Sequence, residues 1–545
     1  MRSSLRLLSA LAAFTCFAPH AGFAATKLVD SIAALQSAIH EAVAGDTITL
    51  KDGSYTTTQA ITVDRAGSAE SPITVSAESI SGVEIAGTHG FNVTASAAHI
   101  VIAGFKFTHT SGTAIIDEGT SHVRFTRNTF LCTGDGPYLT VSGDDAQIDA
   151  NEFGAKKTPG NMIAVAGTGS QVARRLWIHH NYLHDLANSG GEGAQMIRLG
   201  LMSTQSQSIG GALVEYNLLT GCRGVTELIS NRSSGNTYRY NTLLDSPTSQ
   251  FTLRQGNDSI VYGNYFRNTE GMRIYGDRHQ VVSNYFEGNH IAIAIGNGAP
   301  DPTDGTANKN ERPDDCVIAF NTFIDNTTHY FMSRRTPEAL GATNTTFANN
   351  LIQGGETVAK INGPYTDDIW SGNLLWNAGT VGDLPPEGFK QADPLLLAGA
   401  DGIKRLQAGS PAIEAATGNF PGVAFDQDGQ PRPEKKSIGA DEISSAPVTA
   451  HLLLITDVGP NWQEPKAEPA PVPVPAVPPA APVAPPPPAP APAPTTAAPV
   501  NPTPDPAVTA PEVTTPAPAS KKKSAPSKKS PKPAKPVDAT SKITS

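Results

Sequence analysis

The sequence predicts an all-β protein: a right-handed, single-stranded parallel β-helix with an N-terminal capping helix, followed by a disordered tail rich in Pro, Ala and Lys. Two observations lead to this prediction. A triplet of Asn, a variable residue and an aromatic or aliphatic residue recurs about every 23 residues, a spacing typical of solenoid repeats. Each repeat also contains one short, strand-like alternating run bounded by Gly or Asn. The triplets begin at Asn128, Asn151, Asn181, Asn217, Asn241, Asn264, Asn284, Asn321, Asn350 and Asn373.

One strand per short repeat leaves no room for a helix between strands, which excludes a layout of alternating strands and helices. Leucine-rich repeats have a similar period but carry a leucine signature that this chain lacks. Asn suits the turns of a β-helix because it tolerates left-handed backbone and can form a hydrogen-bonded ladder. We therefore expect one coil per repeat, with loops inserted where the spacing lengthens.

The N-terminus predicts export. Residues 1–24 contain Arg2 and Arg6, then an apolar run, then small residues ending at Ala24, as in a secretory signal peptide. The apolar run is too short to cross a bilayer core of about 30 Å. We expect no transmembrane segment and a periplasmic or secreted protein.

Next to this segment, residues 31–43 have the apolar spacing of an amphipathic helix, which would cover the open end of the β-helix and hide its exposed edge. The predicted domain is residues 25–462. Its cysteines, Cys132, Cys222 and Cys316, are odd in number and widely spaced. That favours buried free thiols and leaves one disulfide as an alternative.

The C-terminal part has the composition of unfolded chain. Residues 463–520 are mostly Pro and Ala, which predicts an extended linker that buries no core. Residues 521–545 are rich in Lys, and such a tail either is simply solvated or contacts polyanions of the cell envelope.

Residues 226–289 carry the main functional signal. Arg232, Arg254 and Arg273 lie roughly one repeat apart, so we expect them to stack on one face and bind an acidic polymer. The chain as a whole has a net charge of −10. For binding an acidic polymer, the local cluster of arginines matters more than this net charge, because the fields of exposed charges fade within about 10 Å in salt. We expect a monomer that binds an acidic polysaccharide, and no nucleic acid.

Several segments of this chain resemble the chondroitinase-B-like polysaccharide lyases, polysaccharide lyase family six. They include the motifs ELISNRS, from Glu227, TLRQGN, from Thr252, and GMRIYG, from Gly271. The motifs SPITV, from Ser71, and DQDGQPR, from Asp426, also match the family. The resemblance covers roughly residues 25–445. It implies a β-helix that cleaves uronic-acid polysaccharides by β-elimination, chiefly alginate, with dermatan sulfate as a second substrate.

The resemblance also implies roles for single residues. In the family a calcium ion neutralises the substrate carboxylate, a lysine takes the C5 proton, and an arginine protonates the leaving O4. The family's arginine corresponds to Arg254, and its lysine corresponds to Arg232. This substitution matters, because a guanidinium holds its proton far above neutral pH and is a poor base. Tyr238, Tyr275 and His279 are alternative proton-transfer groups.

The calcium site implied by the resemblance is incomplete. The family uses one Asn and two acids; Glu227 fills the second acid position, Val225 occupies the first, and Glu192 lies near the Asn position. Calcium prefers six to eight oxygen ligands. If calcium is lost, arginines would have to neutralise the carboxylate, and Arg198 and Arg273 are the candidates for binding substrate in this way.

Three functions remain open from the sequence. The first is a uronate-polysaccharide lyase. The second is a carbohydrate-binding β-helix that has lost its base at Arg232, and the third is a glycoside hydrolase, for which no paired acids accompany the arginines. The neighbouring His179 and His180 suggest a metal cluster only superficially. At strand spacing they should point to opposite faces, and we expect them to cap or stack.

Overall fold

The computed structural model describes residues 24–110, 114–187, 193–299, 310–334 and 340–464. Glu192 lies outside these residues. The expected signal peptide, linker and Lys-rich tail also lie outside them, except for Ala24, Gln463 and Glu464. Within the described residues, no helix is both long and apolar enough to cross a membrane.

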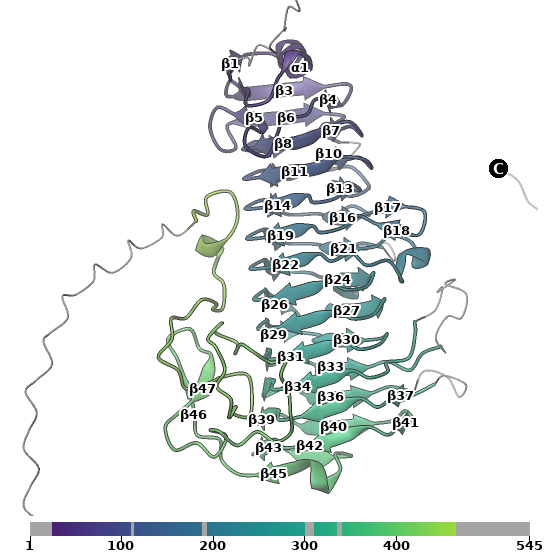
Figure 1. Cartoon of the computed structure of the whole chain (residues 1–545), viewed down its shortest axis with the longest axis vertical. Coiled ribbons are helices and arrows are strands. Elements are labelled where there is room, and N and C mark those ends of the chain that lie inside the picture. The colour runs from purple at the N-terminus through teal and green to yellow at the C-terminus, as the bar shows by residue number, and fades with distance from the viewer. Residues whose placement is uncertain (1–23, 111–113, 188–192, 300–309, 335–339, 465–545) are drawn as a thin grey trace, which may run out of the picture. The chain divides into compact units, whose positions relative to one another are not determined.

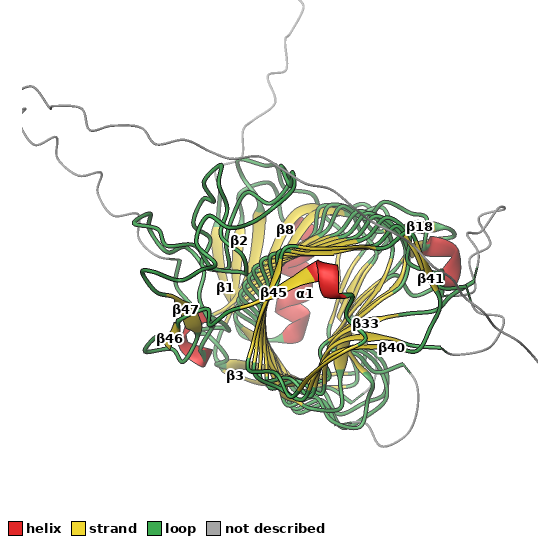
Figure 2. Cartoon of the chain, turned by 90° about the horizontal axis from the view of Figure 1, so that it is seen from below, coloured by secondary structure: helices red, strands yellow, loops and turns green. Residues whose placement is uncertain are grey.

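The predicted parallel β-helix is confirmed. Three long parallel sheets, which we call A, B and C, run the length of the molecule, and each coil contributes one strand to each sheet (Figure 1). Viewed along the axis, the three sheets enclose the core (Figure 2).

Sheet A has 14 strands: β1 (Thr26–Val29), β2 (Thr47–Leu50), β5 (Ile73–Ala77), β8 (Ala98–Ala103), β11 (Ser121–Thr126), β14 (Gln147–Asp149), β19 (Trp177–His179), β22 (Leu213–Glu215), β25 (Thr237–Arg239), β28 (Ile260–Tyr262), β31 (Gln280–Val282), β34 (Val317–Ala319), β38 (Thr346–Ala348) and β42 (Ile369–Ser371). Sheet B also has 14: β3 (Gly53–Thr57), β6 (Val83–Gly87), β9 (Phe105–Phe107), β12 (Thr129–Phe130), β15 (Glu152–Phe153), β20 (Tyr182–His184), β23 (Leu218–Thr220), β26 (Thr242–Ser246), β29 (Tyr265–Thr269), β32 (Tyr285–Glu287), β35 (Thr322–Ile324), β39 (Leu351–Gln353), β43 (Asn373–Trp376) and β45 (Phe389–Gln391).

Sheet C has 13 strands: β4 (Ile61–Val63), β7 (Phe91–Val93), β10 (Ala114–Ile116), β13 (Leu139–Val141), β16 (Ile163–Val165), β21 (Ile197–Leu199), β24 (Glu227–Arg232), β27 (Gln250–Gln255), β30 (Met272–Ile274), β33 (Ile291–Ile295), β36 (Thr328–Met332), β40 (Thr357–Ile361) and β44 (Thr380–Gly382). The remaining elements are short: the pairs β17 (Gly167–Thr168) with β18 (Gln171–Val172), β37 (Ala342–Thr343) with β41 (Tyr365–Thr366), and β46 (Leu396–Ala398) with β47 (Lys404–Leu406), and the 3₁₀ turns η1 (Ser203–Gln205), η2 (Pro386–Gly388) and η3 (Ile455–Asp457).

The core consists of side chains stacked from coil to coil. Strand residues alternate between the interior and the surface, as their period of two requires. In sheet B the buried rings of Phe107, Phe130 and Phe153 follow one another at centroid distances of 4.8 and 4.6 Å. Such stacks bury large apolar areas, the main favourable contribution to folding.

The Asn triplets form the expected ladder. From Asn128 to Asn350, each Asn donates its backbone N–H and its Nδ2–H to the Oδ1 of the Asn one coil further on. The ladder ends at Asn373, and all its members are buried. It satisfies polar groups at the turn between sheets A and B that would otherwise be costly to bury.

Helix α1 (Ile32–Glu41) begins after Ser31, whose Oγ accepts a hydrogen bond from the N–H of Ala34, and it buries Leu35 and Ile39 against the first coil. This confirms the predicted capping helix. The structure also confirms the three cysteines of the predicted domain as buried free thiols.

The C-terminal segment, residues 407–464, turns back and packs along the outside of the β-helix. Its end lies beside β19 and β22, where the N–H of Gly459 donates to the carbonyl of His180 at 2.8 Å (Figure 1). Arg127 Nη1 donates to the carbonyl oxygens of Pro460 and Trp462 at 2.9 and 2.6 Å. Within the segment, the buried Arg432 is paired with Glu442 at 2.6 Å, and Arg432 Nη2 donates to Ser283 Oγ of the β-helix at 3.2 Å. The sequence carried no periodic signal for this packing.

Candidate active site

Two arginines and one carboxylate meet on the outer face of sheet C. Glu227 begins β24, Arg254 lies near the end of β27, and Arg273 is the central residue of β30. Glu227 Oε1 accepts hydrogen bonds from Arg254 Nη1 at 2.8 Å and from Arg273 Nη2 at 3.1 Å. The Glu227 side chain is only 2 % exposed, whereas those of Arg254 and Arg273 are 28 % and 25 % exposed. Glu227 therefore holds each guanidinium from the buried side, while part of each arginine side chain reaches solvent.

The electrostatics of Glu227 follow from this arrangement. Burial alone would raise the pKa of its carboxyl, but the charges and hydrogen bonds of the arginines, above all Arg254, lower it below the ordinary value. Glu227 is thus an anion at neutral pH, and it holds two cations in place.

Arg232 and Arg254 share an open pocket of about 500 Å³. Its other walls come from the loop 201–204, from Gln255 and from Asn310. The sequence predicted the arginines but missed this loop and Asn310. Both lie in insertions between strands, where no repeat pattern marks a residue as part of a site.

Arg232, Arg254 and Arg273 lie on one face of sheet C, as expected, but they do not share one register column. Arg232 pairs in register with Gln255, and Arg273 pairs with Thr252. A register shift after Asn231 leaves Arg254 opposite the irregularity, which turns it out of the column. The three arginines nevertheless gather: Arg254 joins Arg232 in the pocket and Arg273 at Glu227.

Arg198, predicted to bind substrate, is placed differently. It lies on β21 with its guanidinium turned to the adjoining loop, donating from Nε to the carbonyl of Gly200 at 3.3 Å and from Nη2 to that of Leu201 at 2.8 Å. Burial lowers the pKa of Arg198, and Arg254 lowers it further, while Glu227 acts in the opposite direction. Arg198 therefore shapes the pocket wall through Leu201, and it adds positive charge to the cluster.

The described residues do not fit a calcium ion here. Val225 offers no side-chain oxygen, and Glu227 Oε1 already accepts from two guanidinium groups, which would repel a cation. In the described part of the chain, no group of three or more His, Cys, Asp or Glu side chains could hold a metal.

The alternative proton-transfer groups lie away from the pocket. Tyr238 and His279 are fully buried and Tyr275 is 1 % exposed, so none of them can touch a polymer at the surface. Tyr238 donates from its hydroxyl to Asn231 Oδ1 at 2.8 Å, and His279 Nε2 lies 2.9 Å from the carbonyl oxygen of Tyr275. Tyr275 also lies beneath the site, since the guanidinium of Arg273 is 5.6 Å from the centre of its ring.

His179 and His180 each stack on another aromatic ring, as expected, but their own two rings meet edge to face and they do not point to opposite faces. His180 has left-handed backbone with φ of 52°, which breaks the strand alternation, and the Nδ1 atoms of the two rings lie 2.9 Å apart. The ring of His180 stacks on Trp462 of the C-terminal segment at 3.9 Å.

Comparison with known proteins supports this architecture. The sequence profile of the family described as chondroitinase B matches residues 29–351, more than half of the chain. No curated protein matches the sequence.

Solved structures with the same fold include the PL6 family alginate lyase AlyGC, 24 % identical with a TM-score of 0.63 over 70 % of this chain; the match spans 55 % of AlyGC, about half its length. A mannuronic acid specific polysaccharide family 6 lyase from human gut microbiota is 21 % identical with a TM-score of 0.57, over 68 % of this chain and 91 % of that one. A PL6 alginate lyase in complex with a trisaccharide is 17 % identical with a TM-score of 0.60, over 81 % and 96 %. With its family profile, its three-sheet β-helix and these structural neighbours, the chain belongs to the chondroitinase B family.

Proposed function

We propose that this protein is an exported lyase that cleaves a uronic-acid polysaccharide, alginate, by β-elimination. The observation that carries the proposal is the anchoring of Arg254 and Arg273 on buried Glu227, next to a pocket that Arg232 also lines. Family membership, and structural neighbours described as alginate lyases, support the substrate class.

The first chemical requirement is neutralisation of the substrate carboxylate. The C5 proton of a uronate is only weakly acidic beside an ionised carboxylate, so positive charge must stabilise the enolate that develops. Arg273 is the candidate for this task, with Arg254 beside it on Glu227, since a guanidinium can bind a carboxylate through two parallel hydrogen bonds. Glu227 holds both groups before substrate arrives, which limits the reorganisation needed during the reaction.

The second requirement is proton transfer. Arg254 is the candidate for the group beside the leaving O4, since it is both anchored on Glu227 and part of the pocket. Arg232 lines the same pocket and is the candidate for the base. An arginine side chain gives up its proton more readily when it is desolvated beside another cation, and Arg254 lines the same pocket.

A second function is favoured by one specific observation, the guanidinium of Arg232 in the place of a base. With no competent base the same pocket would bind the polymer without cutting it. Dermatan sulfate is the alternative substrate, because its uronate presents the same carboxylate to the arginines.

The test is to mix the full chain with alginate, and separately with dermatan sulfate, and follow the ultraviolet absorbance of the unsaturated uronate that elimination creates. We expect absorbance to rise with alginate and the rise to be lost in Arg254→Ala. Arg278→Ala is the control, because Arg278 is an exposed arginine that is paired with Asp258 and does not line the pocket. A flat trace with alginate binding retained would establish the binding-only alternative.

A further inference from the structure

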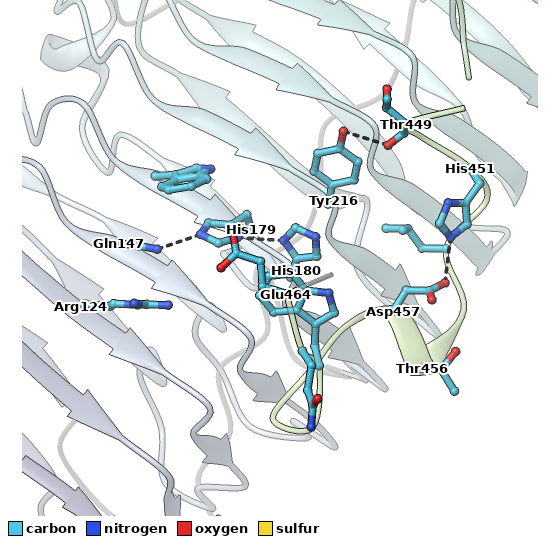
Figure 3. Close-up of a pocket in the computed structure, with 14 residues that line it drawn as sticks. Arg124, Gln147, His179, His180, Tyr216, Thr449, His451, Thr456, Asp457 and Glu464 are labelled. Atoms are coloured by element: carbon cyan, nitrogen blue, oxygen red, sulfur yellow. Dashed lines mark hydrogen bonds and ion pairs between the residues drawn. The ribbon is translucent and has the colours of Figure 1, made fainter. Parts of the chain in front are cut away.

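A second pocket, of about 700 Å³, lies on a different face of the β-helix, between sheet A and the C-terminal segment (Figure 3). One wall comes from β14 and β19, with Gln147, Trp177 and His179, and the facing wall comes from the end of the C-terminal segment. Its volume is in the range of small-ligand sites. It shares no residue with the arginine pocket on sheet C.

The floor of this pocket is aromatic. Trp177 is 42 % exposed, an unusual exposure for so large a ring, and it stacks on His179 at a centroid distance of 4.0 Å. Its Nε1–H donates to Glu215 Oε1 at 2.7 Å, which fixes the plane of the indole. Beside it His180 lies between Tyr216 and Trp462, at 5.1 and 3.9 Å. A rigid, partly exposed indole offers a flat apolar platform at little cost in side-chain entropy.

A hydrogen-bond relay ends in this pocket. Gln147 Nε2 lies 3.0 Å from His179 Nε2, and since the amide nitrogen can only donate, that ring nitrogen accepts. His179 therefore carries its proton on Nδ1 and donates to His180 Nδ1 at 2.9 Å. His180 then carries its own proton on Nε2, for which the described part of the chain shows no acceptor. Burial lowers the pKa of His180 to about 4, so this neutral form is the one present at neutral pH.

The remaining groups at the rim offer both donors and acceptors. Arg124 uses Nε and Nη2 on Asp149, at 2.7 Å each, which leaves Nη1 as a donor among the described contacts. The Thr456 hydroxyl, the Glu464 carboxylate and Oδ1 of Asp457 are the acceptors. Oδ2 of Asp457 already accepts from the N–H of Leu454 at 2.8 Å and lies 3.1 Å from His451 Nε2. Asp149 balances Arg124, and Arg127, which donates to the carbonyls of Pro460 and Trp462, offsets one of the two rim carboxylates. The pocket therefore has no excess positive charge to hold an anionic ligand.

We propose that this pocket binds a neutral sugar, with one pyranose face on Trp177 and its hydroxyls on the donors and acceptors of the rim. A pyranose combines an apolar face of C–H groups with hydroxyls that donate and accept at its edge, and this pocket presents the complementary pattern. The site would hold the protein on an uncharged glycan while the arginine pocket handles the acidic polymer. It does not depend on the lyase activity proposed above.

The test is isothermal titration calorimetry of the full chain with neutral gluco- and manno-oligosaccharides of α and β linkage, and with an oligomannuronate for contrast. We expect at least one neutral oligosaccharide to bind, and Trp177→Ala to weaken it about tenfold or more, given the energy of aromatic stacking. Trp376→Ala is the matched control, because Trp376 is 41 % exposed but lies outside the pocket. Its affinity should stay unchanged.

A second variant tests the site independently, in case Trp177→Ala misfolds. Thr456 is exposed on η3, so Thr456→Arg removes no buried contact and fills the pocket with a long side chain. It should abolish neutral-sugar binding while leaving the melting temperature unchanged. Failure of every neutral oligosaccharide to bind, or binding that both variants retain, would overturn the proposal. So would an oligomannuronate that binds at Trp177 more tightly than the neutral sugars. Arg254→Ala should bind neutral sugar normally, which separates this proposal from the lyase.

Discussion

Glu227→Gln tests whether one buried carboxylate organises the arginine cluster. The amide keeps the size and one acceptor oxygen of Glu227, but it removes the charge that faces Arg254 and Arg273. A hydrogen bond to a charged group contributes about 1.5–3 kcal/mol net. Because the two guanidinium groups are about a quarter exposed and the amide keeps part of the interaction, we expect a loss of about 2 kcal/mol in the free energy of unfolding.

The effect on activity should be separable from this loss of stability. With Arg254 and Arg273 no longer held, kcat/KM on alginate should fall about ten- to hundredfold, since each tenfold corresponds to 1.36 kcal/mol of transition-state stabilisation. Glu215→Gln is the matched control, because Glu215 is also buried and paired with an arginine, Arg239, but on sheet A. It should lose similar stability and keep its lyase rate. Equal loss of activity in both variants would refute the organising role of Glu227.

The interaction of Glu227 with its two arginines also predicts that stability depends on pH. The folded-state pKa of Glu227 is lowered, so its ionised form stabilises the protein at pH values above the ordinary carboxyl pKa, and this contribution is lost as the pH falls through the lowered value. The difference in unfolding free energy between the wild type and Glu227→Gln should therefore be full at neutral pH and shrink in acid. A difference that stays constant down to strongly acidic pH would contradict the assignment. Urea unfolding at a series of pH values measures it.

Three further predictions concern other parts of the molecule. Arg232→Lys should raise the elimination rate at alkaline pH, because an ammonium gives up its proton more readily than a guanidinium; a lower rate across the pH profile would mean that Arg232 itself serves the reaction. Asn241→Ala should cost about 2–4 kcal/mol in urea unfolding, because it leaves buried ladder groups unsatisfied. Asn92→Ala, which removes an Oδ1 without a partner, should cost almost nothing, and equal losses would contradict the ladder's role. Cys132, Cys222 and Cys316 should resist a thiol reagent until the protein unfolds, since burial raises the pKa of Cys222 to about 11 and that of Cys132 to about 12. Rapid reaction of these three thiols in the native state would show that the coils open there.

The fold could be predicted because its determinants are local and repeated. Asn at each turn must satisfy the same buried groups in every coil, so the ladder from Asn128 to Asn373 is visible as a period in the sequence. The capping helix is likewise a local amphipathic pattern. The C-terminal segment was missed, because its packing against His180 and Arg127 depends on contacts between residues far apart in the chain, which follow no period.

The site was only partly predictable for a related reason. Spacing placed Arg232, Arg254 and Arg273 on neighbouring coils, but the register shift after Asn231 decides which of them line the pocket. Glu227 was identified as a residue of the site and expected to bind metal. Its two arginine partners become apparent only when side chains from three strands are placed together.

The most direct test of the central claim is the mass of the products formed from alginate in water enriched in heavy oxygen, with a chelator present. Elimination adds no water, so the account predicts unsaturated oligouronates without the label, formed at a rate that the chelator does not change. Labelled, saturated products would show hydrolysis instead. Intact polymer, or products formed only when calcium is returned, would contradict an elimination supported by arginines.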